Sequence, residues 1–138
     1  MIHNIKFRVF VYENEDVQEL SQAILNILPE AEINAEEAEG LTEDKIIILS
    51  GIVSKKRYTK AFFNLLLESV DLEKLNNDLE RKIDEKGNWF LRFDKQDALD
   101  EIWTILDKGD AIHLKIKIAA YPAKKEIAVD KVREAILN

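Results

Sequence analysis

Residues 109–122 read Gly-Asp-Ala-Ile-His-Leu-Lys-Ile-Lys-Ile-Ala-Ala-Tyr-Pro. Apolar and polar side chains alternate through this stretch, a pattern that predicts a strand with one buried and one exposed face. The apolar face would carry Ile112, Leu114, Ile116 and Ile118, and the polar face His113, Lys115 and Lys117. The polar face is entirely basic, although the chain has a formal net charge of −7. We take this basic face as the main indication of function.

The size and composition of the chain are those of a soluble globular protein. Its 138 residues fit a single domain, 1–138, that can bury a core, and 2 prolines and 4 glycines leave little room for long flexible linkers. The absence of cysteine excludes disulfides, thiolate metal sites and a cysteine nucleophile. There is no signal-peptide pattern and no apolar run near the ~20 residues that span a bilayer. We therefore expect a cytoplasmic protein.

Charge is distributed unevenly along the chain. Residues 1–44 carry 11 acidic and 2 basic side chains, a net charge of −9, whereas residues 45–138 carry 16 acidic and 18 basic side chains, a net charge of +2. An acidic protein is not typical of strong non-specific nucleic-acid binding. Screening over ~8–10 Å nevertheless allows a local basic surface to act separately from a distant acidic one.

Hydrophobic periodicity predicts further strands and helices. Helices are expected from Asp16 to Pro29, after Ser54, after Asp71 and from Pro122 onward, with Glu30–Asp44 as an exposed acidic loop. Alternation predicts strands at Ile2–Tyr12, Ile46–Val53 and Asn88–Asp94, and more weakly at Glu101–Leu106. A turn at 107–110 would pair this last strand with the following one as a hairpin. The order predicts an α+β fold, with a single mixed or antiparallel sheet and helices packed mainly on one face.

The polar faces of three predicted strands share a basic and aromatic character. The first carries Lys6, Arg8, Phe10 and Tyr12, the second Phe90 and Arg92, and the third His113, Lys115 and Lys117. If helices cover the opposite side, these residues form one open surface whose cations suit phosphates and whose aromatic rings suit unpaired bases. The alternative is an ordinary solvated sheet face with lysines that deter edge pairing.

Two further basic clusters lie at predicted helix starts. Lys55-Lys56-Arg57 opens one helix, where cations oppose the helix dipole, so a phosphate partner or simple solvation would explain them. Lys124-Lys125 follows Tyr121-Pro122, where lysines and backbone amides could hold an anion together.

His113 is the main candidate for a catalytic base. It could pair with Asp110 or Asp94 and activate a water molecule. However, the sequence has no nucleophile motif, no glycine-rich phosphate loop and no metal-ligand spacing. With two distant histidines the case for a metal is weak. We therefore expect a non-catalytic protein without a cofactor, and we expect Trp89, Trp103, Phe62 and Phe63 to belong mainly to the core.

Three segments carry a family resemblance: residues 88–96, 109–117 and 120–125, together with the strand that starts at His3. They resemble an archaeal family of predicted RNA-binding proteins and candidate exosome subunits. The resemblance spans most of the chain and is densest over residues 88–125. It implies an α+β fold similar to the large-subunit ribosomal protein that holds the small ribosomal RNA, also described as akin to a double-stranded-RNA-binding domain. It carries no catalytic residues over to this chain.

Pattern and resemblance together predict an RNA-binding protein that recognises the backbone and shape of a structured RNA. It would be linked to RNA processing and would have protein partners there. The alternative is a protein-interaction subunit or homodimer, in which Glu30–Asp44 meets a basic partner or the open face self-associates. The predicted RNA contacts are Lys6, Arg8, Phe10, Lys55, Lys56, Arg57, Phe90, Arg92, His113, Lys115, Lys117, Lys124 and Lys125.

Overall fold

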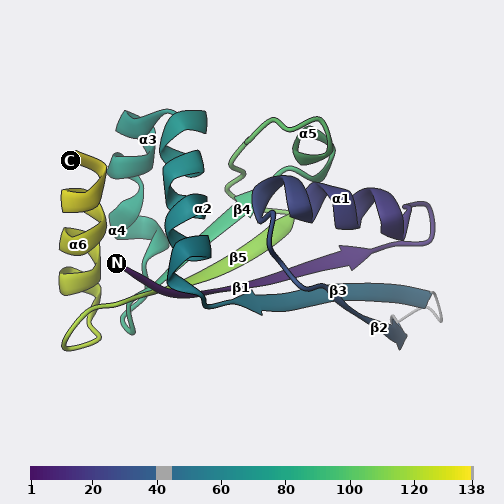
Figure 1. Cartoon of the computed structure of the whole chain (residues 1–138), viewed down its shortest axis with the longest axis horizontal. Helices are drawn as coiled ribbons and strands as arrows, with labels where there is room; N and C mark the ends of the chain where they lie inside the picture. Colours follow the sequence, from purple (N-terminus) through teal and green to yellow (C-terminus); the bar gives the residue numbers. More distant parts are fainter. Residues whose placement is uncertain (40–44, 138) are drawn as a thin grey trace.

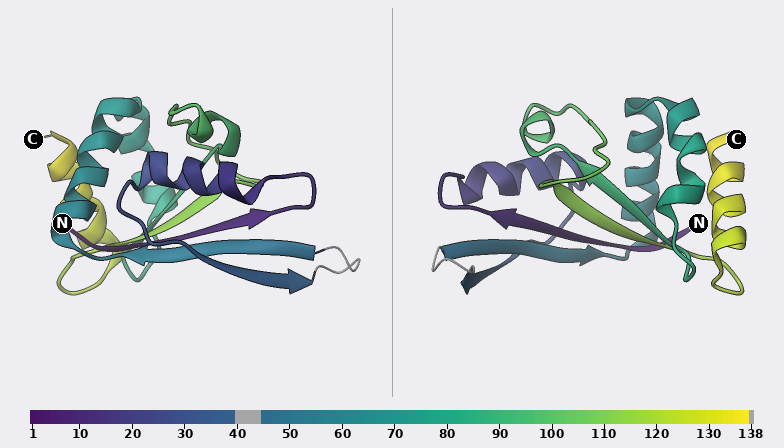
Figure 2. Two further views of the ribbon diagram at one scale, coloured as in Figure 1. Left: turned by 45° about the vertical axis from the view of Figure 1, so that its right-hand side comes forward. Right: turned by 180° about the vertical axis from the view of Figure 1, so that it is seen from behind.

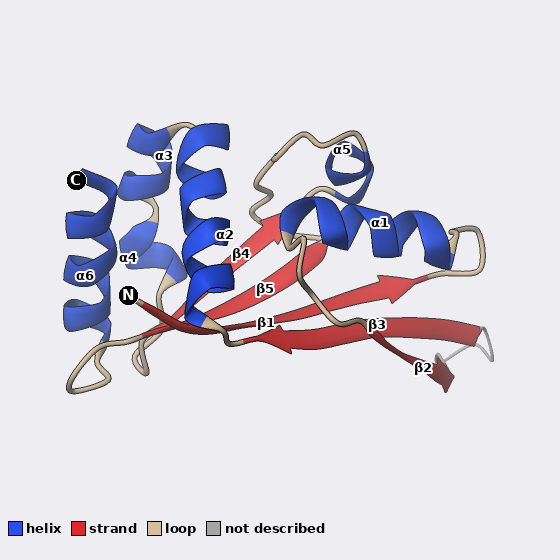
Figure 3. Ribbon diagram, viewed as in Figure 1, coloured by secondary structure: helices blue, strands red, loops and turns tan. Residues whose placement is uncertain are grey.

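One antiparallel sheet with helices on one face makes up the fold (Figure 1). A computed structural model describes residues 1–39 and 45–137. The five strands lie in the order β2-β3-β1-β5-β4, and Figures 2 and 3 show the helices on the same side of them from several directions. The expected α+β fold, with one sheet covered mainly on one face, is therefore confirmed. None of the described helices is long and apolar enough to cross a membrane.

Strands and helices follow in an irregular order along the chain. The strands are β1 (Ile2–Val11), β2 (Asn34–Glu39), β3 (Lys45–Val53), β4 (Asn88–Phe93) and β5 (Ile112–Ile118). The helices are α1 (Val17–Ile27), α2 (Lys56–Ser69), α3 (Leu72–Asn77), α4 (Leu79–Lys82), α5 (Lys95–Leu99) and α6 (Lys125–Leu137).

Alternation in the strands sends one set of side chains into the core. Ile5 and Val9 of β1, Leu114 of β5, and Trp89 and Leu91 of β4 are all almost completely buried. The helices complete this core from above; Phe62 of α2, for example, packs on Trp103, with ring centroids 5.7 Å apart. Because the core lies on one side only, the other face of the sheet remains open (Figure 2).

The prediction of an exposed acidic loop at Glu30–Asp44 is partly wrong. Residues 34–39 form β2, which pairs antiparallel with β3, while residues 40–44 lie outside the described part of the chain. The sequence Asn-Ala-Glu-Glu-Ala-Glu has little intrinsic strand propensity. Pairing with the apolar strand β3 overrides that preference, which is a tertiary effect.

The predicted hairpin across residues 107–110 is wrong. Residues 101–106 form no strand; they run along the outer edge of β4, where Phe93 and Ile105 form an isolated bridge. The Asp94 amide donates to the Thr104 carbonyl and the Leu106 amide to the Arg92 carbonyl. Both edges of β5 are already taken by β1 and β4.

Two helices differ from the prediction, one by a break within it and the other by a later start. The helix after Asp71 divides at Asp78 into α3 and α4, although Leu75, Leu79 and Ile83 are buried as expected. The last helix begins at Lys125 and not at Pro122. Residues 119–124 first carry the chain from the end of β5 to the helical layer (Figure 1).

Candidate nucleic-acid interface

The three basic strand faces meet on one surface because β1, β5 and β4 are neighbours. Arg8 lies opposite His113, which lies opposite Arg92 on the far side. In the next row, Lys6 lies opposite Lys115, which lies opposite Phe90. We call this surface the basic face: Lys6, Arg8, Phe10, Phe90, Arg92, His113, Lys115 and Lys117. It lies on the side of the sheet that the helices leave open.

The basic face is hollowed at its centre. A hollow of about 800 Å³ lies over β3, β1, β5 and β4, with Ile52 and Phe90 among its lining residues. A second hollow of about 260 Å³ shares Lys6 and Lys115 with the first and extends to His3 and Lys117. The cations therefore surround a concave surface that can receive a ligand.

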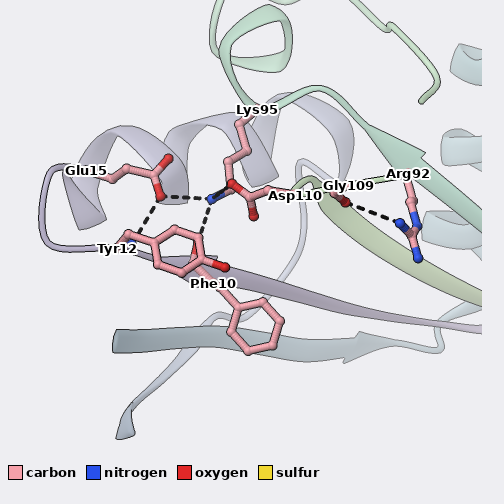
Figure 4. Close-up of polar contacts among 7 residues, drawn as sticks. All are labelled: Phe10, Tyr12, Glu15, Arg92, Lys95, Gly109 and Asp110. Carbon is pink, nitrogen blue, oxygen red and sulfur yellow. Dashed lines mark hydrogen bonds and ion pairs between the residues drawn. The ribbon is translucent and has the colours of Figure 1, made fainter. Parts of the chain in front are cut away.

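Several cations on the basic face are held in place by local contacts. The Arg8 guanidinium lies over the ring of Phe10, 5.2 Å from its centroid. Arg92 Nη1 donates to the carbonyl of Gly109 at 3.2 Å (Figure 4). Lys117 Nζ donates to the carbonyl of Lys86. These contacts restrict the side chains but leave their charge uncompensated, which suits binding of an anion.

Lys95 is buried next to Phe10, at one end of the basic face, and contacts three segments of the chain (Figure 4). Its Nζ donates to the Phe10 carbonyl at 2.6 Å and to Glu15 Oε1 at 2.9 Å, and it pairs with Asp110 Oδ2 at 2.7 Å. The side chain is only 9% exposed. Lys95 thus ties the start of α5 to the end of β1 and to the turn before β5.

His113 occupies the centre of an electropositive row. Burial lowers the pKa of His113, and the positive charges of Arg92 and Arg8 lower it further, while Asp110 opposes the shift. The neutral imidazole is therefore favoured in the free protein at neutral pH. An anion placed between Arg8 and Arg92 would favour the protonated form.

The carboxylates proposed to assist His113 are engaged elsewhere. Asp94 caps α5 by accepting from the Asp97 amide at 2.9 Å, and Asp110 pairs with Lys95. In residues 1–39 and 45–137, neither is hydrogen-bonded to His113, and no three His, Asp or Glu side chains are grouped to hold a metal ion.

One carboxylate borders the basic face. Burial acts to raise the pKa of Asp84, but hydrogen bonds from the Asn88 amide, the Asn88 side chain and the Lys86 amide outweigh it, and Lys115 adds a favourable charge. The net pKa is lowered. Asp84 therefore stays ionised and fixes Asn88 at the start of β4.

The cluster Lys55-Lys56-Arg57 lies off the basic face, at the start of α2. Lys55 and Arg57 both approach the ring of Tyr58, at 5.7 and 4.8 Å from its centroid. Lys56 and Lys60 line a third hollow of about 580 Å³. His3 lines both this hollow and the second one, so the two lie next to each other.

Lys124 and Lys125 lie at the start of α6, also off the basic face. A methyl group placed on Gly87 would lie 4.0 Å from both Lys117 Nζ and the Lys124 carbonyl. The start of α6 is therefore close to the Lys117 end of the basic face.

Sequence reasoning identified the cations of the basic face but missed other parts of the site. Alternation within a strand locates Lys6 or Lys115 without tertiary information. Ile52 sits in a strand whose apolar residues do not alternate with polar ones, so nothing in the pattern marks its 52% exposed side chain. Lys95 has the sequence context of an ordinary surface lysine, and only the packing of α5 shows that it is buried.

Comparison with known proteins is consistent with the family resemblance. A family model described as RNA binding matches residues 4–118. An RNA-binding protein of Pyrococcus abyssi is 35% identical over 142 residues, covering 96% of this chain and 92% of the relative. An uncharacterised protein of Methanocaldococcus jannaschii is 28% identical over 149 residues, covering 100% of this chain and 97% of the relative.

A solved structure shows the same fold. A DUF54 protein from Methanothermobacter thermautotrophicus is 42% identical to this chain, with a TM-score of 0.90 and coverage of 100% of this chain and 99% of the other. The family model spans β1 to β5 and thus every strand of the basic face. On this match and on the 35% identical relative, the chain belongs to the protein family described as RNA binding.

Proposed function

We propose that this protein binds RNA through the basic face and recognises the backbone and shape of a structured RNA. The family description and the name of the Pyrococcus abyssi relative support RNA as the ligand. The arrangement of cations on the open side of the sheet supports the basic face as the binding surface.

The observation that carries this proposal is the register of β1, β5 and β4. It places Lys6 directly beside Lys115, and His113 between Arg8 and Arg92. Like charges in directly opposed positions destabilise an antiparallel sheet. A phosphate backbone across these rows would neutralise the repulsion, which solvent alone only screens.

RNA binding of this kind depends on salt. Each phosphate contact displaces condensed counterions, so the logarithm of the association constant falls with the logarithm of salt concentration by about 0.7 per contact for a single strand. Five cations face the open side, Lys6, Arg8, Arg92, Lys115 and Lys117, so we expect a slope steeper than about −2.

Affinity for a structured RNA, measured against salt concentration, tests the proposal. The double variant Lys115→Glu/Lys117→Glu should weaken binding strongly and flatten the salt dependence. Lys74→Glu/Lys131→Glu is the matched control, because it changes the net charge equally at two exposed lysines of α3 and α6, in the helical layer. Equal affinities for the double variant and the control would contradict the proposed surface.

We further propose that the protein acts without catalysis, as a cytoplasmic component of RNA processing linked to the exosome. In this role it presents RNA to a partner protein and does not cleave it. Incubation with RNA should leave the strand intact, and His113→Ala should change affinity only. RNA cleavage that His113→Ala abolishes, in a folded variant, would contradict the non-catalytic role.

A protein-interaction role is the second candidate, and β2 is the observation that favours it. Among the described residues β2 pairs with β3 alone, so its other edge has free backbone groups, and it carries Glu36 and Glu37. A basic partner segment could add to this edge. Light scattering and co-purification from the native host distinguish the two candidates. A monomer that co-purifies with RNA alone would count against the second.

A further inference from the structure

We propose that the basic face takes an unpaired segment of the RNA, with one base stacked on Phe90. The sugar-phosphate chain then follows β1 toward His3 and turns to Lys56 and Lys60 at the start of α2. This inference rests on the proposed function and specifies the part of the RNA that the site receives.

Phe90 is the ring on the basic face that is available for stacking. It is 43% exposed and lies opposite Lys115 in the register of β4 and β5. Phe10, by contrast, already has the Arg8 guanidinium over its ring. In the described part of the chain, the ring of Phe90 has no aromatic or cationic partner. A base inside a duplex has both faces covered, whereas an unpaired base in a loop has a free face that can stack on Phe90.

The shape of the central hollow also favours an unpaired nucleotide. Leu91 and Leu114 line it, although their side chains point to the core on the other side of the sheet. The hollow therefore reaches the sheet backbone between the cationic side chains. Its volume of about 800 Å³ is in the range of small-molecule sites. A splayed nucleotide can enter such a depression, whereas a duplex presents a convex surface that contacts only its rim.

Three neighbouring hollows, which share lining residues, mark a path for the chain. The first and second share Lys6 and Lys115, and the second and third share His3. From Arg8 to His3 this path covers about 17 Å along β1. The third hollow is lined by Thr59 of α2 and Ala135 of α6, so it lies on the helix side of the sheet.

Because this path passes from the open side of the sheet to the helix side, we expect the RNA that follows it to be a flexible single strand. A duplex is stiff over lengths far greater than this molecule and cannot turn around the end of the sheet. A single strand can contact the basic face and then reach Lys56 and Lys60. The two lysines would then serve as a phosphate contact beyond the sheet.

Two RNAs of the same stem sequence test the stacking. One is a hairpin with a loop that contains the fluorescent base 2-aminopurine, and the other is a blunt duplex without unpaired nucleotides. The hairpin should bind at least about tenfold more tightly, and 2-aminopurine fluorescence should change on binding. Phe90→Ala should lose about tenfold in hairpin affinity together with the fluorescence change, and Phe90→Tyr should restore both. Ile102→Ala is the control, because Ile102 is 53% exposed but lies in the segment between α5 and β5, away from the basic face.

A hairpin with an added single-stranded tail tests the path. Lys56→Ala/Lys60→Ala should remove the affinity that the tail adds and reduce the salt slope, whereas Lys131→Ala should not. Equal binding of duplex and hairpin, unchanged by Phe90→Ala, would overturn the inference; if Lys115→Glu/Lys117→Glu still abolished binding, the proposed function would stand. If neither RNA bound, both would fail.

Discussion

Lys6 and Lys115 lie directly opposite each other on β1 and β5, and both side chains are exposed on the open side of the sheet. Opposed like charges disfavour an antiparallel pair by roughly 0.2–1 kcal/mol. The folded protein therefore retains an unfavourable pair at the centre of its basic face. A polyanionic ligand would relieve the repulsion between the two lysines, and this relief would contribute favourably to the free energy of binding.

Replacement of Lys115 by Thr should raise stability and reduce RNA affinity at once. Removal of the repulsion with Lys6, together with the strand preference of threonine, should increase the free energy of unfolding by about 0.5 kcal/mol at low salt. Urea denaturation at low and high salt measures the gain, which should shrink as salt screens the charges. RNA affinity should fall because one phosphate contact is lost.

Lys117→Thr is the matched control for that gain. The partner of Lys117 on β1 is Asn4, so no like-charge pair is relieved, and the hydrogen bond to Lys86 is lost. This variant should also bind RNA less tightly, but without added stability. An equal, salt-independent gain in both variants would show that repulsion is not the cause.

RNA affinity should rise as pH falls through the histidine range. Because the pKa of His113 is lowered in the free protein by burial and by Arg92 and Arg8, a bound phosphate that raises this pKa makes binding take up a proton. Affinity should therefore increase as the pH drops below about 6.5. His113→Gln should flatten this dependence, as measured by titration at constant salt.

The same group has the opposite effect on the stability of the free protein. The unfolded chain binds the proton near the ordinary histidine pKa, about 6.5, more readily than the folded chain does. The folded state should thus lose stability as pH falls below this value, and His113→Gln should reduce the loss. If RNA affinity depended on pH in the same way in His113→Gln and in the unmodified protein, His113 would not be the group that takes up a proton on RNA binding.

Lys95→Met should destabilise the protein by about 2–3 kcal/mol. The substitution removes the donor to the Phe10 carbonyl and leaves Glu15 and Asp110 without their cation. Urea denaturation measures the loss. Lys131→Met, at an exposed position of α6, should stay within about 0.5 kcal/mol of the unmodified protein. Similar unfolding midpoints for the two variants would mean that the Lys95 cluster contributes little.

Gly51→Ala should destabilise the sheet by about 1–3 kcal/mol. A Cβ atom there would lie 2.5 Å from the Glu32 carbonyl oxygen and 2.6 Å from Cζ of Phe7, and neither the backbone nor the buried ring can move freely. Ser50→Ala changes the preceding residue, which faces the open side, and should cost much less. Chemical denaturation of both variants makes the comparison, and equal midpoints would contradict the predicted clash.

The local sequence pattern alone was sufficient to predict β1, β4 and β5 and the two faces of each strand. The two-residue period places Ile5, Leu114 and Leu91 in the core and Lys6, Lys115 and Arg92 on the opposite side, because successive side chains of any strand point to opposite faces. The α+β class followed from the same periodicities. The prediction of a strand at residues 101–106 is wrong because this weakly alternating segment runs irregularly along the edge of β4.

What the sequence by itself determined is the charge of each strand face, since this depends only on residues two positions apart. Only the tertiary structure decided that β1, β5 and β4 are neighbours and that their register places Lys6 opposite Lys115. It also decided the burial of Lys95, whose partners come from β1, the segment before α1 and the turn before β5. These features arise from contacts between residues far apart in the chain, and such contacts leave no periodic signal in the sequence.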